Sequence, residues 1–269
     1  MIRFTDVSLT FDGRYVLKNL SFEVPSGATQ VILGGSGCGK TTILRLILGL
    51  LHPESGSILI DGQEIVGLTE RQMVPIRAKM AMVFQGSALF DSLTVRENVG
   101  YRLYEEQALS DDIIERLIVL SLCFVGLEDT LEKMPAELSG GMKKRVAIAR
   151  ALVCNPEMIL YDEPTAGLDP INTHLINELI RRNQNEQRLT QVVVTHDLET
   201  AYRVADRLIM LHRGEKIFDG SSDMLQASDD PRIRTFLRPQ EVLAAAGCFP
   251  DKDGGIRVVA PTMDEESPA

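Results

Sequence analysis

The sequence lacks features that would assign it to several common classes of protein. No apolar run reaches the length of a membrane span, about 18 residues or more, because Arg45 and Gly49 interrupt the longest one, residues 43–51. The first residues show no basic segment followed by an apolar stretch, so no secretory signal peptide is predicted. Only four cysteines occur among 269 residues, without metal-ligand spacing, which predicts reduced thiols in a cytosolic protein.

Basic charge is also scarce. The chain has 28 Lys and Arg residues against 38 Asp and Glu residues, a formal net charge of −10. Nucleic-acid phosphates would be repelled on average, so no nucleic-acid partner is expected. At 44% hydrophobic residues the chain can nevertheless bury a sizeable core, which argues against wholesale disorder.

The order of the patterns predicts an α/β fold. Near the N-terminus, alternation at residues 20–24 and a turn at Asp61-Gly62 predict antiparallel strands. Farther along, short apolar runs alternate with helical segments, which favours a parallel sheet covered by helices. The strand candidates are residues 28–33, 158–161 and 191–194, and the helix candidates are residues 113–122, 139–152, 174–183 and 198–205.

A glycine-rich segment follows the first apolar run and fits the phosphate-loop pattern G-x-x-x-x-G-K-[ST]. Its glycines let backbone N–H groups converge on phosphate oxygens, and the following helix adds its positive end. We expect Lys40 to reach the β- and γ-phosphates, Thr41 to bind Mg²⁺ and Thr42 to contact a phosphate. The segment and the first helical residues are Gly34, Gly35, Ser36, Gly37, Cys38, Gly39, Lys40, Thr41 and Thr42.

Cys38 lies inside this glycine-rich segment. Lys40 and a helix N-terminus both favour a thiolate over a thiol. Cys38 is therefore expected to be more reactive than a buried structural cysteine.

Two carboxylates end the strand candidate at residues 158–161. Asp162 suits a direct or indirect contact with Mg²⁺. Glu163 can point the opposite way and hold the attacking water as general base. Many buried strands end in acids that only cap the next element, but the phosphate loop upstream favours the catalytic interpretation.

Ser139, Gly140 and Gly141 precede a second helix candidate. A serine at a helix start commonly caps it, but the same arrangement can receive a phosphate, with the Ser139 hydroxyl and the Gly141 N–H as donors. Two phosphate-binding helix ends with a single phosphate loop make sense if two chains meet head to tail. Each chain would then place this segment on the nucleotide of the other.

Taken in order, these segments resemble the nucleotide-binding domain of ATP-binding cassette (ABC) transporters. The resemblance covers residues 1 to about 237 and implies a P-loop NTPase that binds ATP. It implies a RecA-like core with a parallel sheet, an N-terminal antiparallel β subdomain and an inserted α-helical subdomain at approximately residues 86–152. Residues 238–269 would form a partly flexible C-terminal extension.

The resemblance also implies roles for single residues. Gln85 would sense Mg²⁺ or water and couple to the membrane partner, Asp169 would lie at the dimer seam, and His196 would contact the γ-phosphate. Phe11, or alternatively Tyr15, would stack on adenine, because stacking needs only an aromatic face. One departure is Met142, which stands where the family's signature segment, Leu138 to Met142 here, usually has glutamine.

Three further segments, residues 84–99, 137–145 and 230–237, are similar to the ATPases of Mla-type, Mce-linked phospholipid transporters. That resemblance implies a homodimer at the cytoplasmic face of the inner membrane. It would drive a permease that moves phospholipid between the inner and outer membranes. A Mce-domain lipid-binding protein and a STAS-type regulator are the further partners that it suggests.

Two other functions stay open: the ATPase of an importer for a polar solute such as an amino acid, and a soluble assembly ATPase. A DNA-repair member of the family would carry a long coiled-coil or zinc-binding insertion. The stretch between Lys40 and Ser139 is short and has neither heptads nor cysteine clusters. Translation factors of the family usually carry two cassettes, and this chain has one.

Overall fold

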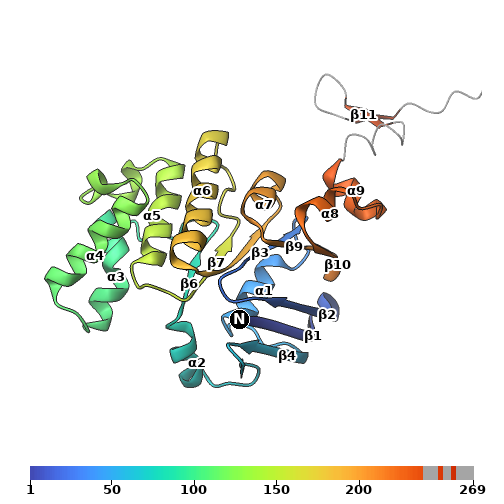
Figure 1. Ribbon diagram of the computed structural model, residues 1–269, viewed down its shortest axis with the longest axis horizontal. Helices are drawn as coiled ribbons and strands as arrows, with labels where there is room; N and C mark the ends of the chain where they lie inside the picture. The colour runs from blue at the N-terminus through green and yellow to red at the C-terminus, as the bar shows by residue number, and fades with distance from the viewer. Residues whose placement is uncertain (239–247, 251–255, 259–269) are drawn as a thin grey trace, which may run out of the picture. The chain divides into compact units, whose positions relative to one another are not determined.

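The computed structural model describes residues 1–238, 248–250 and 256–258. The chain forms two compact units, Met1–Ser222 and Asp223–Ala269 (Figure 1). Within the described residues, no helix combines the length and apolar character that a membrane crossing needs.

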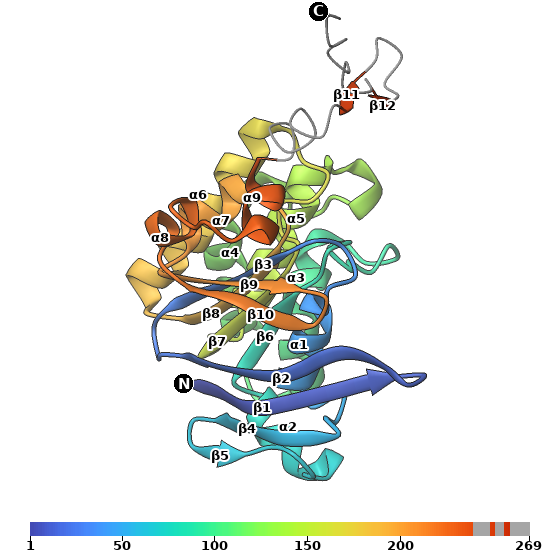
Figure 2. The same ribbon diagram turned by 90° about the vertical axis from the view of Figure 1, so that its right-hand side faces the viewer.

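An antiparallel sheet begins the first unit and forms a layer of its own (Figure 2). Its strand order is β2-β1-β4-β5, and Phe4 on β1 lies opposite both Phe22 on β2 and Ile58 on β4. The prediction of antiparallel strands in this region is therefore confirmed. The strands are β1 (Ile2–Phe11), β2 (Arg14–Val24), β4 (Ser55–Ile60) and β5 (Gln63–Glu64).

A six-stranded sheet forms the centre of the same unit, in the order β10-β9-β3-β8-β7-β6. All neighbouring strands are parallel except the edge pair β10 and β9. The three predicted strands are confirmed as β3, β7 and β8, whereas β6, β9 and β10 were not predicted. The strands are β3 (Thr29–Gly34), β6 (Met80–Val83), β7 (Met158–Asp162), β8 (Thr190–Thr195), β9 (Arg207–His212) and β10 (Glu215–Gly220).

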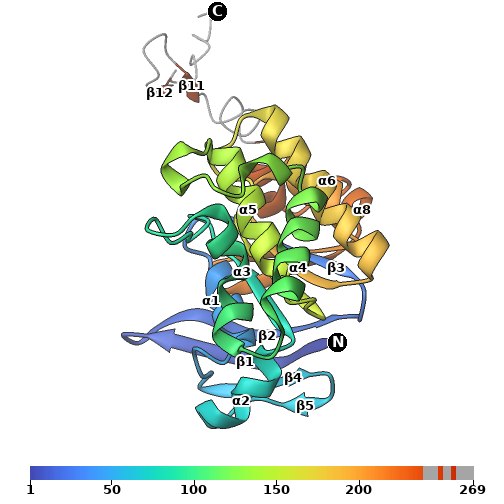
Figure 3. The ribbon, with the colours of Figure 1, turned by 90° about the vertical axis from the view of Figure 1, so that its left-hand side faces the viewer.

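Helices cover this sheet, and α3, α4 and α5 pack against one another in the inserted segment between β6 and β7 (Figure 3). The four helix candidates are confirmed as α4, α5, α6 and α7, and the helix expected after the phosphate loop is confirmed as α1, whereas α2 and α3 were not predicted. The helices are α1 (Lys40–Ile47), α2 (Glu70–Arg77), α3 (Val95–Glu106), α4 (Asp111–Phe124), α5 (Gly140–Leu152), α6 (Pro170–Gln187) and α7 (Leu198–Val204), with 3₁₀ turns η1 (Glu128–Thr130) and η2 (Pro135–Glu137).

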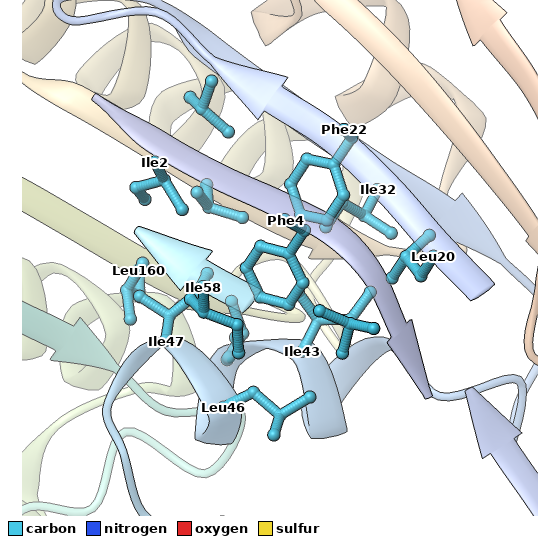
Figure 4. Close-up of a cluster of buried hydrophobic side chains, with 14 of the residues drawn as sticks. Ile2, Phe4, Leu20, Phe22, Ile32, Ile43, Leu46, Ile47, Ile58 and Leu160 are labelled. Atoms are coloured by element: carbon cyan, nitrogen blue, oxygen red, sulfur yellow. The ribbon is translucent and has the colours of Figure 1, made fainter. Parts of the chain in front are cut away.

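The hydrophobic core that positions the phosphate loop lies between the antiparallel sheet, α1 and the central sheet (Figure 4). Phe4 and Phe22 stack with ring centroids 4.6 Å apart. Ile43 and Ile47 bury one face of α1 in the same cluster. Each such side chain contributes about 1.5–3 kcal/mol when it is fully buried. The core therefore holds α1, whose first residue is Lys40, firmly in place.

The second unit contains the end of α8 (Ser222–Gln226), helix α9 (Pro231–Leu237) and a two-stranded antiparallel ladder. Helix α9 begins after Asp230, whose Oδ1 accepts a hydrogen bond from the backbone N–H of Arg232 at 2.8 Å. The ladder pairs β11 (Cys248–Pro250) with β12 (Ile256–Val258) and was not predicted. The rest of the predicted extension lies outside the described residues, so its partial flexibility stays a prediction.

Candidate nucleotide site

The phosphate loop connects β3 to α1, as the sequence pattern predicts. Gly35, Ser36 and Gly37 are exposed, so their backbone can approach a ligand. Gly39 has a φ of 106°, a left-handed conformation that favours glycine. A Cβ added at Gly39 would lie 2.8 Å from the carbonyl oxygen of Val16. The loop therefore needs a glycine here both for its backbone angle and for space.

Lys40 points back into this loop. Its Nζ donates to the carbonyl oxygens of Gly34 at 2.8 Å and Gly35 at 3.1 Å. The same nitrogen lies 3.4 Å from Glu163 Oε1, and both side chains are largely buried. The structure thus joins the phosphate-loop lysine directly to the predicted general base.

Glu163 lies at the carboxyl end of β7, where its backbone has a left-handed φ of 47°. Its Oε2 accepts hydrogen bonds from Thr195 Oγ1 at 3.2 Å and from the backbone N–H of His196 at 3.3 Å. His196 Nδ1 is 2.9 Å from the same oxygen. β7 and β8 are parallel neighbours, so their carboxyl ends meet at one edge of the sheet. The Thr195 contact was missed, although Thr195 directly precedes His196 in the sequence.

Thr41 and Asp162 form a second contact at the same edge of the sheet. Thr41 Oγ1 donates to Asp162 Oδ1 at 3.0 Å. Burial raises the pKa of Asp162 above its ordinary value, and the hydrogen bond from Thr41 opposes that effect. The next residue, Thr42, is half-buried on α1, and its phosphate contact stays a prediction.

Cys38 does not have the environment predicted for a reactive thiol. The residue is only 7% exposed. Burial raises the pKa of its thiol, and this outweighs the opposing effects of Lys40 and of the backbone N–H groups at the helix start. The expectation of a thiolate was therefore wrong, because the sequence did not show how deeply the side chain is covered.

Gln85 follows β6 and is exposed. Its carbonyl oxygen accepts a hydrogen bond from Lys144 Nζ, which also donates to the carbonyl oxygen of Glu163 at 3.2 Å. Lys144 was not predicted as a site residue. The available signal was a lysine in a helix whose neighbouring residues, Val146 to Ala149, are apolar and buried.

The remaining predicted residues lie at the N-termini of two other helices. Ser139 Oγ accepts from the backbone N–H of Met142 at 3.3 Å and so caps α5. Asp169 Oδ1 accepts from the backbone N–H of Asn172 at 3.0 Å and caps α6. Hydrogen bonds from the backbone N–H and from the side chain of Asn172 hold the pKa of Asp169 below its ordinary value. A Cβ added at Gly141 would collide with the Asn172 side chain, so the two helix starts touch.

Both aromatic candidates for the adenine contact are exposed near the turn between β1 and β2. Phe11 is 49% exposed and Tyr15 is 58% exposed. Phe11 pairs with Arg14 across the turn, and Tyr15 pairs with Thr10 on the preceding strand. Either ring is therefore free to stack on a base, and the choice between them stays open.

These observations define the class of protein. The profile of the ABC transporter family matches residues 17–166, more than half of the chain. The chain belongs to the ABC transporter family, and it is an ATP-binding, ATP-hydrolysing subunit. The predicted fold class and enzyme class are thereby confirmed.

The chain is also similar to particular members of this family. It is 38% identical to the intermembrane phospholipid transport system ATP-binding protein MlaF of Haemophilus influenzae, over 96% of this chain and 94% of that protein. It is 36% identical to the probable ribonucleotide transport ATP-binding protein mkl of Mycobacterium leprae, over 96% of this chain and 72% of that protein. Among solved structures, the dimeric cassette MJ0796 bound to ADP and Pi matches with a TM-score of 0.76 and 34% identity, over 82% of this chain and 98% of that chain.

Proposed function

We propose that this subunit hydrolyses Mg-ATP at the interface of a homodimer and thereby drives a permease that moves phospholipid between the inner and outer membranes. The observation that carries the catalytic part is the Glu163 carboxylate, which lies between Lys40 and His196 at the end of the phosphate loop. The observation that supports the transported substrate is the similarity to MlaF, a phospholipid transport ATP-binding protein.

The catalytic roles follow from the contacts of each side chain. Lys40 carries the positive charge that a γ-phosphate would meet beside the loop, and Glu163, 3.4 Å from that charge, would accept a proton from the attacking water. The backbone N–H of His196 and the hydroxyl of Thr195 hold the Glu163 carboxylate in position. The His196 ring is largely exposed beside that carboxylate, where it could contact the γ-phosphate.

A Mg²⁺ ion fits the donor set beside these residues. The Thr41 hydroxyl and the Asp162 carboxylate supply the hard oxygen ligands that this ion prefers, and Gln85 would join them from its exposed position. When bound, the ion would neutralise part of the charge on the phosphates.

The dimer would complete each site from the other chain. Ser139, Gly140, Gly141 and Asp169 lie at helix N-termini, where backbone N–H groups favour anions. Ser139, Gly140 and Asp169 are exposed, so a second chain could reach the signature segment. The dimeric form of the solved relative MJ0796 supports this arrangement.

Purification from membranes tests the transport role. The tagged subunit should co-elute with a permease of the inner membrane, a Mce-domain lipid-binding protein and a STAS-type regulator, and the tag should lie at the cytoplasmic face. Co-elution with a soluble solute-binding protein would instead support import of a polar solute. The mycobacterial relative is named for the probable transport of ribonucleotides. Soluble partners alone would support an assembly ATPase.

Two smaller assignments belong to the same proposal. Loss of the stacking aromatic should weaken ATP binding by about 5- to 150-fold, since stacking on a base contributes roughly 1–3 kcal/mol. Calorimetric titration of Phe11→Ala and Tyr15→Ala with ATP identifies the ring.

We also assign residues 1–237 to the ATPase domain, with residues 86–152 as its helical subdomain and 238–269 as an extension. A chain ending at Leu237 should therefore retain ATP binding.

A further inference from the structure

One basic side chain of α5 donates hydrogen bonds to two main-chain carbonyls of the catalytic site. Lys144 is only 5% exposed. Its Nζ donates to the carbonyl oxygen of Gln85 and, at 3.2 Å, to that of Glu163. One ammonium group thus joins the segment after β6 to the segment after β7.

A second cation on the same helix holds the continuation of the first segment. Arg150 donates to the carbonyl oxygens of Ser87 at 2.9 Å and Ala88 at 2.8 Å. Residues 85–88 are therefore attached to α5 at two points, Lys144 and Arg150, and only Lys144 also reaches the catalytic segment.

Three of the four carbonyl groups that Lys144 and Arg150 bind belong to residues with a left-handed backbone conformation. Glu163, Ser87 and Ala88 have φ values of 47°, 62° and 48°. Residues other than glycine rarely adopt this region unless their surroundings impose it. The cations of α5 supply such surroundings at both segments.

Burying the charged ammonium group of Lys144 costs desolvation free energy, which an apolar side chain at this position would not. Burial lowers the pKa of Lys144 because it disfavours the charged ammonium, and the nearby charges of Asp162 and Glu163 oppose that effect. A methionine could fill similar space without desolvating a charge. The property that lysine adds at this position is the donation of hydrogen bonds to the two carbonyls.

We propose that Lys144 is a positioning residue that holds the backbones of Gln85 and Glu163 in register with each other and with α5. This inference rests on the proposed function, because it takes Glu163 as the general base. Ser139 caps the same helix and is assigned to the nucleotide of the other chain. A shift of α5 on dimer closure is therefore passed through Lys144 to the catalytic residues of its own chain.

The test compares Lys144→Met with Lys144→Arg and with Lys133→Met, the same substitution at an exposed lysine. Lys144→Met should lower kcat by on the order of 10- to 100-fold, because small displacements of a reacting group have effects of that size. The Kd for ATP should change less than about threefold, since the phosphate loop keeps its own contacts. Lys144→Arg retains the donors and should recover most of kcat, and Lys133→Met should match the wild type.

Two further measurements separate positioning from other roles. Thermal unfolding should show a folded chain for every variant, and Lys144→Leu, which also lacks a donor, replaces Lys144→Met if the latter does not fold. In a Glu163→Gln background, Lys144→Met should still form a dimer with ATP, because the proposed role lies in hydrolysis.

The inference is overturned by an unchanged kcat in Lys144→Met. It is also overturned if kcat, ATP affinity and Tm fall together in both Lys144→Met and Lys144→Arg, because that result indicates a general structural role. Turnover that persists in Glu163→Gln alone refutes the assignment of the base and so the proposed function, whatever the Lys144 variants do.

Discussion

Replacing Glu163 by glutamine tests the centre of the site with the smallest change in shape. In the structure Oε2 accepts three contacts, from Thr195 and from the backbone and ring of His196, while Oε1 faces Lys40 at 3.4 Å. A glutamine oxygen can keep the contacts of Oε2. Its amide nitrogen would then face Lys40, and the base and the ion pair would both be lost.

The expected loss of turnover follows from the role of the base. A positioned general base contributes typically 10²- to 10⁴-fold, so kcat should fall by about that factor, or roughly 2.7–5.5 kcal/mol in the barrier. Binding should respond in the opposite direction. Two unit charges 3.4 Å apart attract by about 5 kcal/mol at an effective dielectric constant of 20, which is a ceiling for this pair. Within the part of the chain that the structure describes, Glu163 supplies the carboxylate that lies within 4 Å of Lys40, and in its absence a phosphate can take that place.

The assay measures phosphate release, ATP affinity by calorimetry and dimer formation by light scattering. Glu163→Gln should bind ATP at least as tightly as the wild type, lose nearly all turnover and accumulate as an ATP-bound dimer. Lys40→Ala should instead weaken ATP binding. Glu157→Gln, the same substitution at an exposed glutamate, is the matched control and should retain wild-type turnover. Turnover of Glu163→Gln within threefold of the wild type would refute the assignment.

The remaining predictions concern packing and thiol chemistry. Gly141→Ala places a Cβ against the Asn172 side chain and should lower the free energy of unfolding by about 1–3 kcal/mol. At Gly140 the nearest neighbour of a new Cβ is 3.8 Å away, so Gly140→Ala should leave the Tm unchanged or raise it; the reverse order of the two Tm values would contradict this packing. At pH 7, maleimide should modify exposed Cys123 well before Cys38, whose burial raises its thiol pKa and lowers the thiolate fraction. Mass spectrometry of the labelled peptides identifies the modified cysteine. Modification of Cys38 before Cys123 would contradict this prediction and support a reactive thiol at Cys38.

Short-range patterns account for most of what could be predicted. The phosphate loop is encoded by its own residues, since Gly39 takes a backbone angle that suits glycine and Lys40 begins a helix with an apolar face. The strand β7 was predictable because four consecutive apolar residues, 158–161, precede two carboxylates, and the structure buries all five residues of the strand. By contrast, β6 (Met80–Val83) consists of two methionines, an alanine and a valine, and methionine and alanine favour helix over strand.

The sequence alone determined the class of chemistry, because phosphate binding depends on residue types at fixed short spacings along the chain. Only the tertiary structure decided which side chains meet. Glu163 contacts Lys40 and His196 because β3, β7 and β8 are neighbours in one parallel sheet and end at the same edge. Lys144 reaches Glu163 for a similar reason, since helix packing brings α5 against residues distant in sequence. Proximity of this kind depends on strand order and on the packing of the core, which local spacing does not encode.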